Sequence, residues 1–222
     1  MITLAIDTAS LNCAVALMQD GRIVARVSEK IGKGHAEKLI GQINEACGIA
    51  KIELSSIDRI AVNIGPGSFT GVRIGVATAR GLALALEKPA IGVSSLEAIG
   101  FEAHGHFPKS HIIALIDAGR DMVYRQDFDE NLQPLAPATV QDREEVGATL
   151  DDKAILAGPF SKAIAHLAGF KDSSVCFLDA PDVASFAKLS QNKASDGSLK
   201  PLYLREADAK PQTSFSVPRK KE

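Results

Sequence analysis

The alternation of apolar and polar stretches predicts that the chain opens with strands and continues with a helix. Short apolar runs at 4–8, 13–18 and 22–27 predict three strands, and the Asp20-Gly21 pair between the last two is typical of a hairpin turn. From 35 to 47 the apolar positions recur every three or four residues, which predicts an amphipathic helix.

A buried strand, a glycine loop and a long helix come next. The apolar run 59–64 predicts the strand, 65–71 holds the glycines, and 72–86 predicts a helix rich in small residues. A further strand at 89–93 precedes a second helix, whose start is marked by the Ser-x-x-Glu capping box at 94–97.

The second half of the chain repeats this order of elements. Strands are predicted at 111–117, 122–128, 154–157 and 175–178, and helices at 161–167 and 183–191. The strands that end at Asp7 and Asp117 each turn through small residues into a second strand, which favours a duplicated, two-lobed α/β protein with mixed sheets. We expect a first lobe at 1–104 that is rejoined by 184–206, a second lobe at 105–183, and a disordered tail at 207–222.

Composition narrows the classes of function. The 222 residues include 25 Lys and Arg against 27 Asp and Glu, and the resulting net charge of −2 argues against an overall electrostatic grip on nucleic acid. Cys13, Cys47 and Cys176 are far apart, which argues against disulfides and favours a reducing compartment. Without a basic leader or an apolar run near the ~20 residues of a membrane helix, we expect a soluble, cytoplasmic protein that makes no membrane contact.

The glycine loop allows two interpretations. A strand, a glycine loop and a helix can present backbone N–H groups to a phosphate. However, the loop lacks the Walker lysine, and Gly65, Gly67 and Gly71 do not have the spacing of the dinucleotide fingerprint. A tight turn that lets the helix pack closely on its sheet is the favoured interpretation.

The helix after the loop has two contrasting faces. Small residues share one face, namely Gly71, Gly75, Thr78 and Ala79. The other face mixes arginines with apolar residues, namely Arg73, Ala77, Arg80 and Leu84. Small residues at this spacing permit close backbone approach, whereas arginines on a partly apolar face suit a protein interface or, alternatively, a solvated surface.

Candidate catalytic groups are few. Asp7, with Thr8 and Ser10, could hold a nucleotide phosphate or a Mg²⁺ water, although a carboxylate that caps turn amides is slightly favoured. The histidines form no zinc pattern, and a metal site from His104 and His106 with His111 is weaker than a solvated loop. A serine nucleophile elbow is also absent from the sequence.

Three segments together resemble the TsaB family, also called YeaZ. They read Ile6-Asp7-Thr8-Ala9-Ser10, Gly65-Pro66-Gly67-Ser68-Phe69-Thr70-Gly71-Val72-Arg73-Ile74-Gly75 and Pro201-Leu202-Tyr203-Leu204-Arg205. The resemblance extends from residue 1 to about 206. It implies the two-lobed actin-like fold of sugar kinases, Hsp70 and actin (ASKHA), with duplicated RNase H-like lobes.

The same resemblance implies a subunit without catalytic activity. The catalytic sister family, TsaD, carries a pattern like Asn-His-Leu-Glu-Gly/Ala-His, whose two histidines hold the metal. Here the corresponding stretch reads Ser94-Ser95-Leu96-Glu97-Ala98-Ile99, and Ser95 and Ile99 cannot replace two imidazole ligands. We therefore expect no metal and no cofactor bound by this subunit alone, with ATP or ADP at a composite site left open.

The resemblance also implies partners. TsaD would form a heterodimer with this chain, the ATPase subunit TsaE would join them, and the complex would transfer threonylcarbamoyl to N6 of adenosine 37 in ANN-decoding tRNAs. This chain would contact tRNA only through the complex and would self-associate in isolation. Residues of two first-lobe helices are expected to form the partner interface, namely His35, Leu39, Ile43, Gly71, Arg73, Gly75, Thr78, Ala79 and Arg80.

Three other functions compete with this one. A nucleotide-dependent small-molecule kinase or ATPase of the same fold would use Asp7 and Asp117, but the chain is short for a sugar-binding kinase. A peptidase, a label carried by the wider glycoprotease family, lacks a nucleophile and base. An RNA-binding module would depend on Arg219-Lys220-Lys221 and a few surface arginines.

Overall fold

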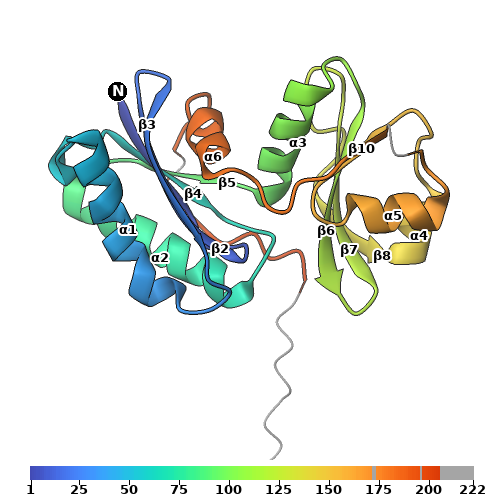
Figure 1. The fold of residues 1–222 in the computed structure, drawn as a ribbon, viewed down its shortest axis with the longest axis horizontal. Helices are drawn as coiled ribbons and strands as arrows, with labels where there is room; N and C mark the ends of the chain where they lie inside the picture. The colour runs from blue at the N-terminus through green and yellow to red at the C-terminus, as the bar shows by residue number, and fades with distance from the viewer. Residues whose placement is uncertain (172–173, 196, 206–222) are drawn as a thin grey trace, which may run out of the picture.

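Two five-stranded mixed sheets form the framework of the computed structural model, which describes residues 1–171, 174–195 and 197–205 (Figure 1). The first sheet has the order β3-β2-β1-β4-β5, built from β1 (Ile2–Asp7), β2 (Asn12–Gln19), β3 (Arg22–Lys30), β4 (Arg59–Asn63) and β5 (Ala90–Val93). The second has the order β10-β9-β6-β7-β8, built from β6 (Ile112–Gly119), β7 (Met122–Phe128), β8 (Thr139–Asp142), β9 (Ile155–Ala157) and β10 (Val175–Cys176).

The helices follow the same duplicated plan. They are α1 (His35–Ala50), α2 (Phe69–Leu86) and α3 (Ser95–His106) in the first half, and α4 (Arg143–Ala148), α5 (Ser161–Ala168) and α6 (Val183–Ser190) in the second, with a short 3-10 turn η1 (Leu54–Ser56). In each half an antiparallel meander of three strands is followed by two strands that add in parallel beside the first one. This identical topology confirms the predicted duplication.

Helices cover both faces of each sheet (Figure 1). α1 and α2 lie on the outer face of the first sheet, and α4 and α5 on the outer face of the second. The inner faces are covered by exchanged helices, because α6 packs on the first sheet and α3 on the second. The exchange brings α3 and α6 together between the sheets.

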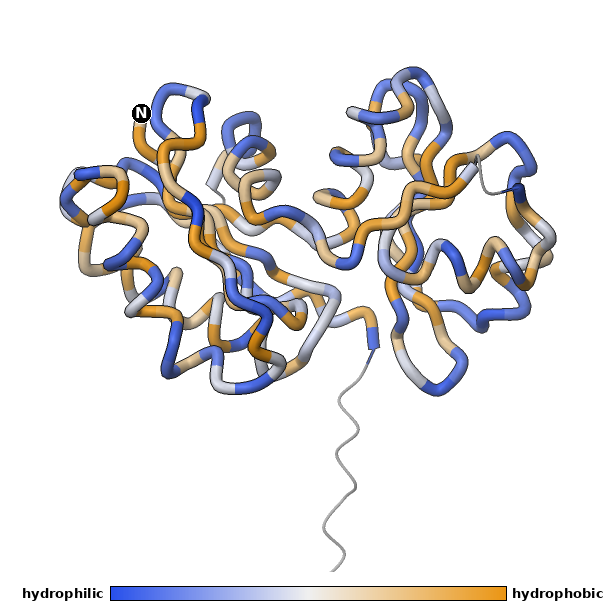
Figure 2. The backbone as a smooth tube through the Cα atoms, viewed as in Figure 1, coloured by the Kyte–Doolittle hydropathy of each residue, from blue (hydrophilic) through white to orange (hydrophobic). Residues whose placement is uncertain are grey.

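Each sheet packs against helices on both of its faces, because successive side chains along a strand point to opposite faces. In β1, Leu4 and Ile6 point towards α1 and α2, whereas Ala5 points towards α6. The face under α6 is lined mainly by alanines, and this leaves room for the fully buried ring of Phe186. Figure 2 shows the resulting pattern, with hydrophobic strands inside each lobe and hydrophilic turns at the periphery.

Most predicted elements exist, with bounds shifted by a few residues. The helix predicted at 72–86 already begins at Phe69, where the Ser68 side chain accepts a hydrogen bond from the Gly71 N–H. The capping box before α3 is confirmed. Sequence reasoning missed β8 and α4, because their residues are mostly half-buried or exposed and carry no apolar periodicity.

The predicted lobe boundaries stay a prediction, but the packing of α6 and α3 can be compared with them. Residues 184–190 of α6 pack on the first sheet, in line with a return to the first lobe. The prediction assigned α3 to the first lobe, but its Leu96, Ile99 and Ala103 join the core of the second. The predicted tail at 207–222 lies outside the described residues.

The expectation that no apolar run approaches the length of a membrane-spanning helix was wrong for one helix. Among the described residues, α2 alone is long and apolar enough to match a membrane span by length and composition. Val72, Val76 and Ala79 of this helix belong to the core of the first lobe.

Candidate functional site

A buried polar network joins the carboxyl ends of β1 and β4 to the start of α3. Asn63, the last residue of β4, donates from Nδ2 to Asp7 Oδ1 at 2.8 Å. Its Oδ1 accepts from Gly65 N at 2.8 Å and from Ser95 Oγ at 2.9 Å. Asp7, Asn63 and Ser95 are all at least nine-tenths buried, so the network fixes where three elements meet.

Asp7 is fully engaged within the chain. Its Oδ1 also accepts from Ala9 N at 2.9 Å, and its Oδ2 accepts from Ser10 Oγ at 3.2 Å. Burial raises the pKa of the Asp7 carboxyl, and the hydrogen bonds from Ala9, Asn63 and Ser10 oppose that rise. The contacts agree with the favoured interpretation, a carboxylate that caps the β1–β2 turn.

Thr8 also points into the protein. It is 1% exposed, and its Oγ1 donates to the Gly71 carbonyl at 2.7 Å. Ser10 remains half-buried beside Asp7. Nucleotide binding by Asp7, Thr8 and Ser10 stays a prediction, and in this conformation two of the three side chains face inward.

The glycine loop packs directly against the β1–β2 turn. Ser68 N donates to Ala9 O at 2.7 Å, and a Cβ at Gly71 would overlap the Thr8 carbonyl oxygen. At Gly75 a Cβ would lie 2.5 Å from Thr8 Oγ1. The loop therefore serves close packing of α2 on β1, as the favoured interpretation expected.

This packing also involves residues of the predicted partner interface. Gly71, Gly75 and Ala79 are buried against the sheet of their own chain. Leu39 and Ile43 are buried in the same core, and His35 is only 5% exposed. Intrachain packing buries these six residues, although His35 and Gly71 also line a pocket between the starts of α1 and α2, and their place in the interface stays a prediction. Thr78 is half-buried, whereas Arg73 and Arg80 are exposed and stay predicted interface residues.

The exposed side of α2 begins with an aromatic and arginine cluster that the sequence alone did not reveal. The Arg73 guanidinium lies 3.8 Å from the centroid of the Phe69 ring. Arg73 Nε donates to Tyr203 Oη at 2.9 Å, and the two aromatic rings have centroids 5.3 Å apart. Phe69 is 39% and Tyr203 47% exposed. The only sequence signal for Tyr203 was its place in the Pro-Leu-Tyr-Leu-Arg segment of the resemblance.

The start of α3 has no imidazole where TsaD would carry its metal ligands. Ser95 is hydrogen-bonded to Asn63, and Ile99 is fully buried in the core of the second lobe. Among residues 1–171, 174–195 and 197–205, no group of three or more His, Cys, Asp or Glu side chains could hold a metal ion. His104 instead contacts the Glu130 carbonyl at 3.1 Å.

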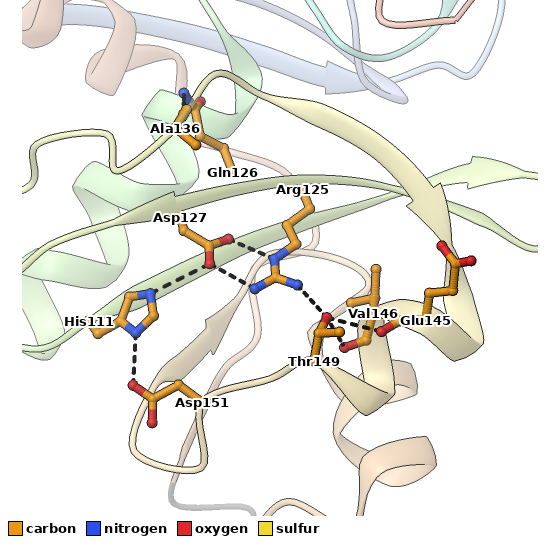
Figure 3. Close-up of polar contacts among 9 residues, drawn as sticks. All are labelled: His111, Arg125, Gln126, Asp127, Ala136, Glu145, Val146, Thr149 and Asp151. Carbon is orange, nitrogen blue, oxygen red and sulfur yellow. Dashed lines mark hydrogen bonds and ion pairs between the residues drawn. The ribbon is translucent and has the colours of Figure 1, made fainter.

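His111 takes part in a charged cluster of the second lobe (Figure 3). Its Nδ1 lies 3.1 Å from Asp151, and its Nε2 lies 3.6 Å from Asp127. Arg125 forms a bidentate pair with Asp127 through two bonds of 2.7 Å and also donates to Thr149 Oγ1 at 3.0 Å. The cluster ties β6 and β7 to the segment between α4 and β9.

Asp117 caps the turn after its strand as Asp7 does, but at a solvent-exposed position. It is exposed and accepts from Gly119 N at 2.8 Å across its turn. Arg205 donates to the neighbouring Ala118 carbonyl at 2.8 Å, so the segment after α6 contacts the turn between β6 and β7.

Glu102 couples the exchanged helices. From α3 it accepts hydrogen bonds from Asp182 N at 2.6 Å and Ser185 Oγ at 2.7 Å, both at the start of α6. Burial raises the pKa of the Glu102 carboxyl to about 7, against the lowering effect of these two bonds. Sequence reasoning gave no indication of this contact.

Comparison with known proteins decides the family. The family model described as "TsaD: tRNA N6-adenosine threonylcarbamoyltransferase" matches residues 25–192. The Escherichia coli tRNA threonylcarbamoyladenosine biosynthesis protein TsaB is 39% identical over 133 residues, which cover 59% of this chain and 57% of that protein. The Haemophilus influenzae protein of the same name is 28% identical over 219 residues, with 91% of this chain and 92% of that protein covered. The chain belongs to the TsaB/YeaZ family. It is thus a member of the tRNA threonylcarbamoyladenosine (t6A) biosynthesis system.

Solved structures agree with that assignment. YeaZ from Pseudomonas aeruginosa matches with a TM-score of 0.76 and 29% identity, covering 91% of this chain and 99% of that one. The ethanolamine utilization protein EutJ from Carboxydothermus hydrogenoformans shares the fold at 11% identity, with a TM-score of 0.50 over 84% of this chain and 88% of that one. The TsaB/YeaZ chain has the two-lobed ASKHA fold that the resemblance implied.

Proposed function

We propose that this TsaB/YeaZ chain is a non-catalytic scaffold of cytoplasmic t6A synthesis. It pairs with TsaD, and TsaE joins the pair. TsaD then transfers threonylcarbamoyl to N6 of adenosine 37 in ANN-decoding tRNAs. The chain itself supplies neither a metal ligand nor a nucleophile to that reaction.

The observation that carries this proposal is the start of α3. Two positions that hold histidine ligands in the TsaD pattern are Ser95 and Ile99 here. Ser95 Oγ donates to Asn63 Oδ1 at 2.9 Å, and Ile99 is fully buried beside Phe128 in the second core. A hydroxyl that is tied to an amide, together with an aliphatic side chain, cannot bind a transition metal.

The outer face of α2 supports pairing with another protein. Arg73, Ala77, Arg80 and Leu84 are exposed along it, and Leu84 is 83% exposed. Arginine and aromatic residues are enriched among the side chains that dominate protein interfaces, and Phe69 and Tyr203 add to Arg73 at one end of this face. We propose that TsaD docks here, that a second copy occupies the face in isolation, and that ATP or ADP binds only at a composite site.

Co-purification tests the pairing. The chain should elute with TsaD in one complex, and TsaE should join only when both are present. The variant Leu84→Asp should lose TsaD while keeping the melting temperature of the wild type, because it places a charge on an exposed apolar position. Retention of TsaD by Leu84→Asp would count against this docking face.

An activity assay separates the scaffold from a small-molecule kinase or ATPase of the same fold. The purified chain alone should neither hydrolyse ATP nor phosphorylate small hydroxyl compounds above the rate of a buffer blank. Turnover that disappears in the Asp7→Asn variant would instead support the enzyme, because Asp7 is the carboxylate such an enzyme would use.

A further inference from the structure

One histidine of the second lobe lies between two carboxylates. His111 stands directly before β6, the central strand of its sheet, with β7 on one side and β9 on the other. Its Nδ1 lies 3.1 Å from Asp151 Oδ2, in the segment that leads into β9, and its Nε2 lies 3.6 Å from Asp127 Oδ2 on β7 (Figure 3). The ring therefore bridges two segments on opposite sides of its own strand.

The register of the sheet places the ring relative to both carboxylates. Asp127 on β7 pairs with Ile113 on β6, and side chains two residues apart along a strand share a face, so His111 and Asp127 lie on the same face. On the other side, the His111 carbonyl accepts a hydrogen bond from Ile155 N at 2.8 Å, at the first residue of β9. Main-chain pairing thus holds the three segments together independently of the side chains.

Both ring nitrogens face groups that only accept hydrogen bonds. A neutral imidazole carries one N–H and one unprotonated nitrogen, whereas an ionised carboxylate offers acceptors alone. A proton on Nδ1 suits Asp151 but leaves the lone pair of Nε2 facing Asp127. This Nε2 is buried and has no hydrogen-bond partner among the residues that the structure describes. Only the imidazolium form of His111, with a proton on each nitrogen, suits both carboxylates.

The surrounding charges keep both acidic groups available as anions. Arg125 holds Asp127 through two bonds of 2.7 Å, the fork geometry of a pair with an ionised carboxylate. A hydrogen bond from Lys153 N, and then the one with His111, hold the pKa of the Asp151 carboxyl below its usual value. Imidazoles in general change charge between about pH 5 and 8, and in that range Asp151 is already ionised.

Asp151 also organises the turn that precedes β9. Its Oδ1 accepts from Lys153 N at 3.0 Å, and its carbonyl accepts from Ala154 N at 3.0 Å. Through the contact with His111, this turn is joined to the start of β6. A change in the charge of the ring therefore acts on the turn at 151–154 more than on the sheet, whose main-chain bonds do not involve the ring.

We propose that His111, Asp127 and Asp151 form a pH-sensitive switch in the second lobe. The imidazolium attracts both carboxylates and keeps the turn at 151–154 closed. As the pH rises and the ring loses a proton, one nitrogen faces a carboxylate without a hydrogen, and the turn opens more often. The switch lies in the second lobe and not on the proposed TsaD docking face of α2, so it does not rest on the proposed function.

Hydrogen exchange of the Lys153 and Ala154 amides in the isolated full chain tests the switch. After correction for the intrinsic effect of pH on exchange, their protection should be roughly threefold higher at pH 5.5 than at pH 8, which is the effect expected of a partly exposed ion pair. In His111→Gln, whose side chain does not titrate, this difference should disappear. Because Glu102 titrates at about 7 in both proteins, its contribution cancels in the comparison. The same pH dependence in both proteins would overturn the proposal.

Two neighbouring acids supply a matched pair of variants. Asp151→Asn keeps an oxygen for Lys153 N but removes the charge beside His111 Nδ1, whereas Asp152→Asn makes the same change in charge at the next exposed residue. Only Asp151→Asn should lose most of the pH-dependent protection. An equal response to the two variants would show that net charge, and not this contact, controls the turn.

NMR of the histidine rings gives a readout that does not need His111→Gln to fold. The His111 ring signals, followed against pH, should change at a lower midpoint pH in Asp151→Asn than in the wild type, because an anion that favours the protonated ring has been removed. Asp152→Asn should move the midpoint by less. An unchanged midpoint in Asp151→Asn would overturn the switch, whatever the exchange data show.

Discussion

Three glycines set how closely α2 approaches β1. Gly67, Gly71 and Gly75 all face the β1–β2 turn or the Thr8 hydroxyl, and none has room for a Cβ without a shift of backbone or side chain. The sequence predicted that small residues would allow a close approach. It could not identify Thr8 as the partner, because Thr8 and Gly71 are 63 residues apart in the chain and only the folded sheet joins them.

Gly75→Ala should destabilise the first lobe. Its Cβ would lie 2.5 Å from Thr8 Oγ1, and overpacking of this kind costs about 1–3 kcal/mol. Gly81→Ala is the matched control, because Gly81 lies on the same helix with nothing within 4 Å, and alanine there should stabilise the helix by up to about 1 kcal/mol. Urea unfolding measures both, and equal stability of the two variants would show that the approach at Gly75 is not tight.

Glu102 should make the stability of the protein depend on pH. Its pKa is raised from 4.5 to about 7 in the folded state, so the folded chain binds an extra proton between these values. The contribution of this group to the free energy of unfolding is therefore fully present below about pH 4.5 and falls as the pH rises towards 7. Above pH 7 it is lost, and the total loss is at most about 3 kcal/mol.

Glu102→Gln keeps an acceptor for Asp182 N and Ser185 Oγ but removes the titration. Urea unfolding at pH 5 and at pH 7.5 compares it with the wild type, so that the raised pKa of Asp7 cancels in the difference. The variant should gain stability over the wild type at the higher pH. A constant difference between the two proteins at both pH values would contradict the buried, titrating carboxyl.

At the scale of elements, local patterns predicted strands and helices where a buried face imposes a period. α1 and the opening meander follow such patterns closely. β8 and α4 do not, because the burial of both elements is mostly partial. The aromatic cluster at α2 could not be predicted either, since Arg73 and Tyr203 are 130 residues apart and meet only through the return of the chain after α6.

Arg73→Ala should weaken pairing with TsaD without unfolding the chain. Truncation of an arginine that packs on aromatic rings in an interface commonly costs about 2 kcal/mol, or roughly 30-fold in affinity. Arg22→Ala removes an exposed arginine from the start of β3, far along the chain from this cluster, and serves as the control. Calorimetric titration with TsaD measures both, and equal affinities would argue against the cluster as a contact.

At the scale of the whole molecule, duplication and exchange of helices define the architecture. The sequence indicated the duplication through the Asp7 and Asp117 turns. It could not indicate that α3 would pack on the second sheet and α6 on the first, because an amphipathic pattern specifies that a helix is buried and not which sheet buries it. The exchange also explains why the start of α3, where TsaD carries its ligands, lies between the lobes.

The central claim is that this chain assists a reaction whose chemistry belongs to TsaD. The most direct test is the rate of t6A formation on an ANN-decoding tRNA, with threonylcarbamoyl-adenylate supplied and TsaD, TsaE and this chain added singly or together. We predict no product with this chain alone and a higher rate when it joins TsaD and TsaE. Product formed by this chain without TsaD, or an unchanged rate when it is left out, would contradict the account.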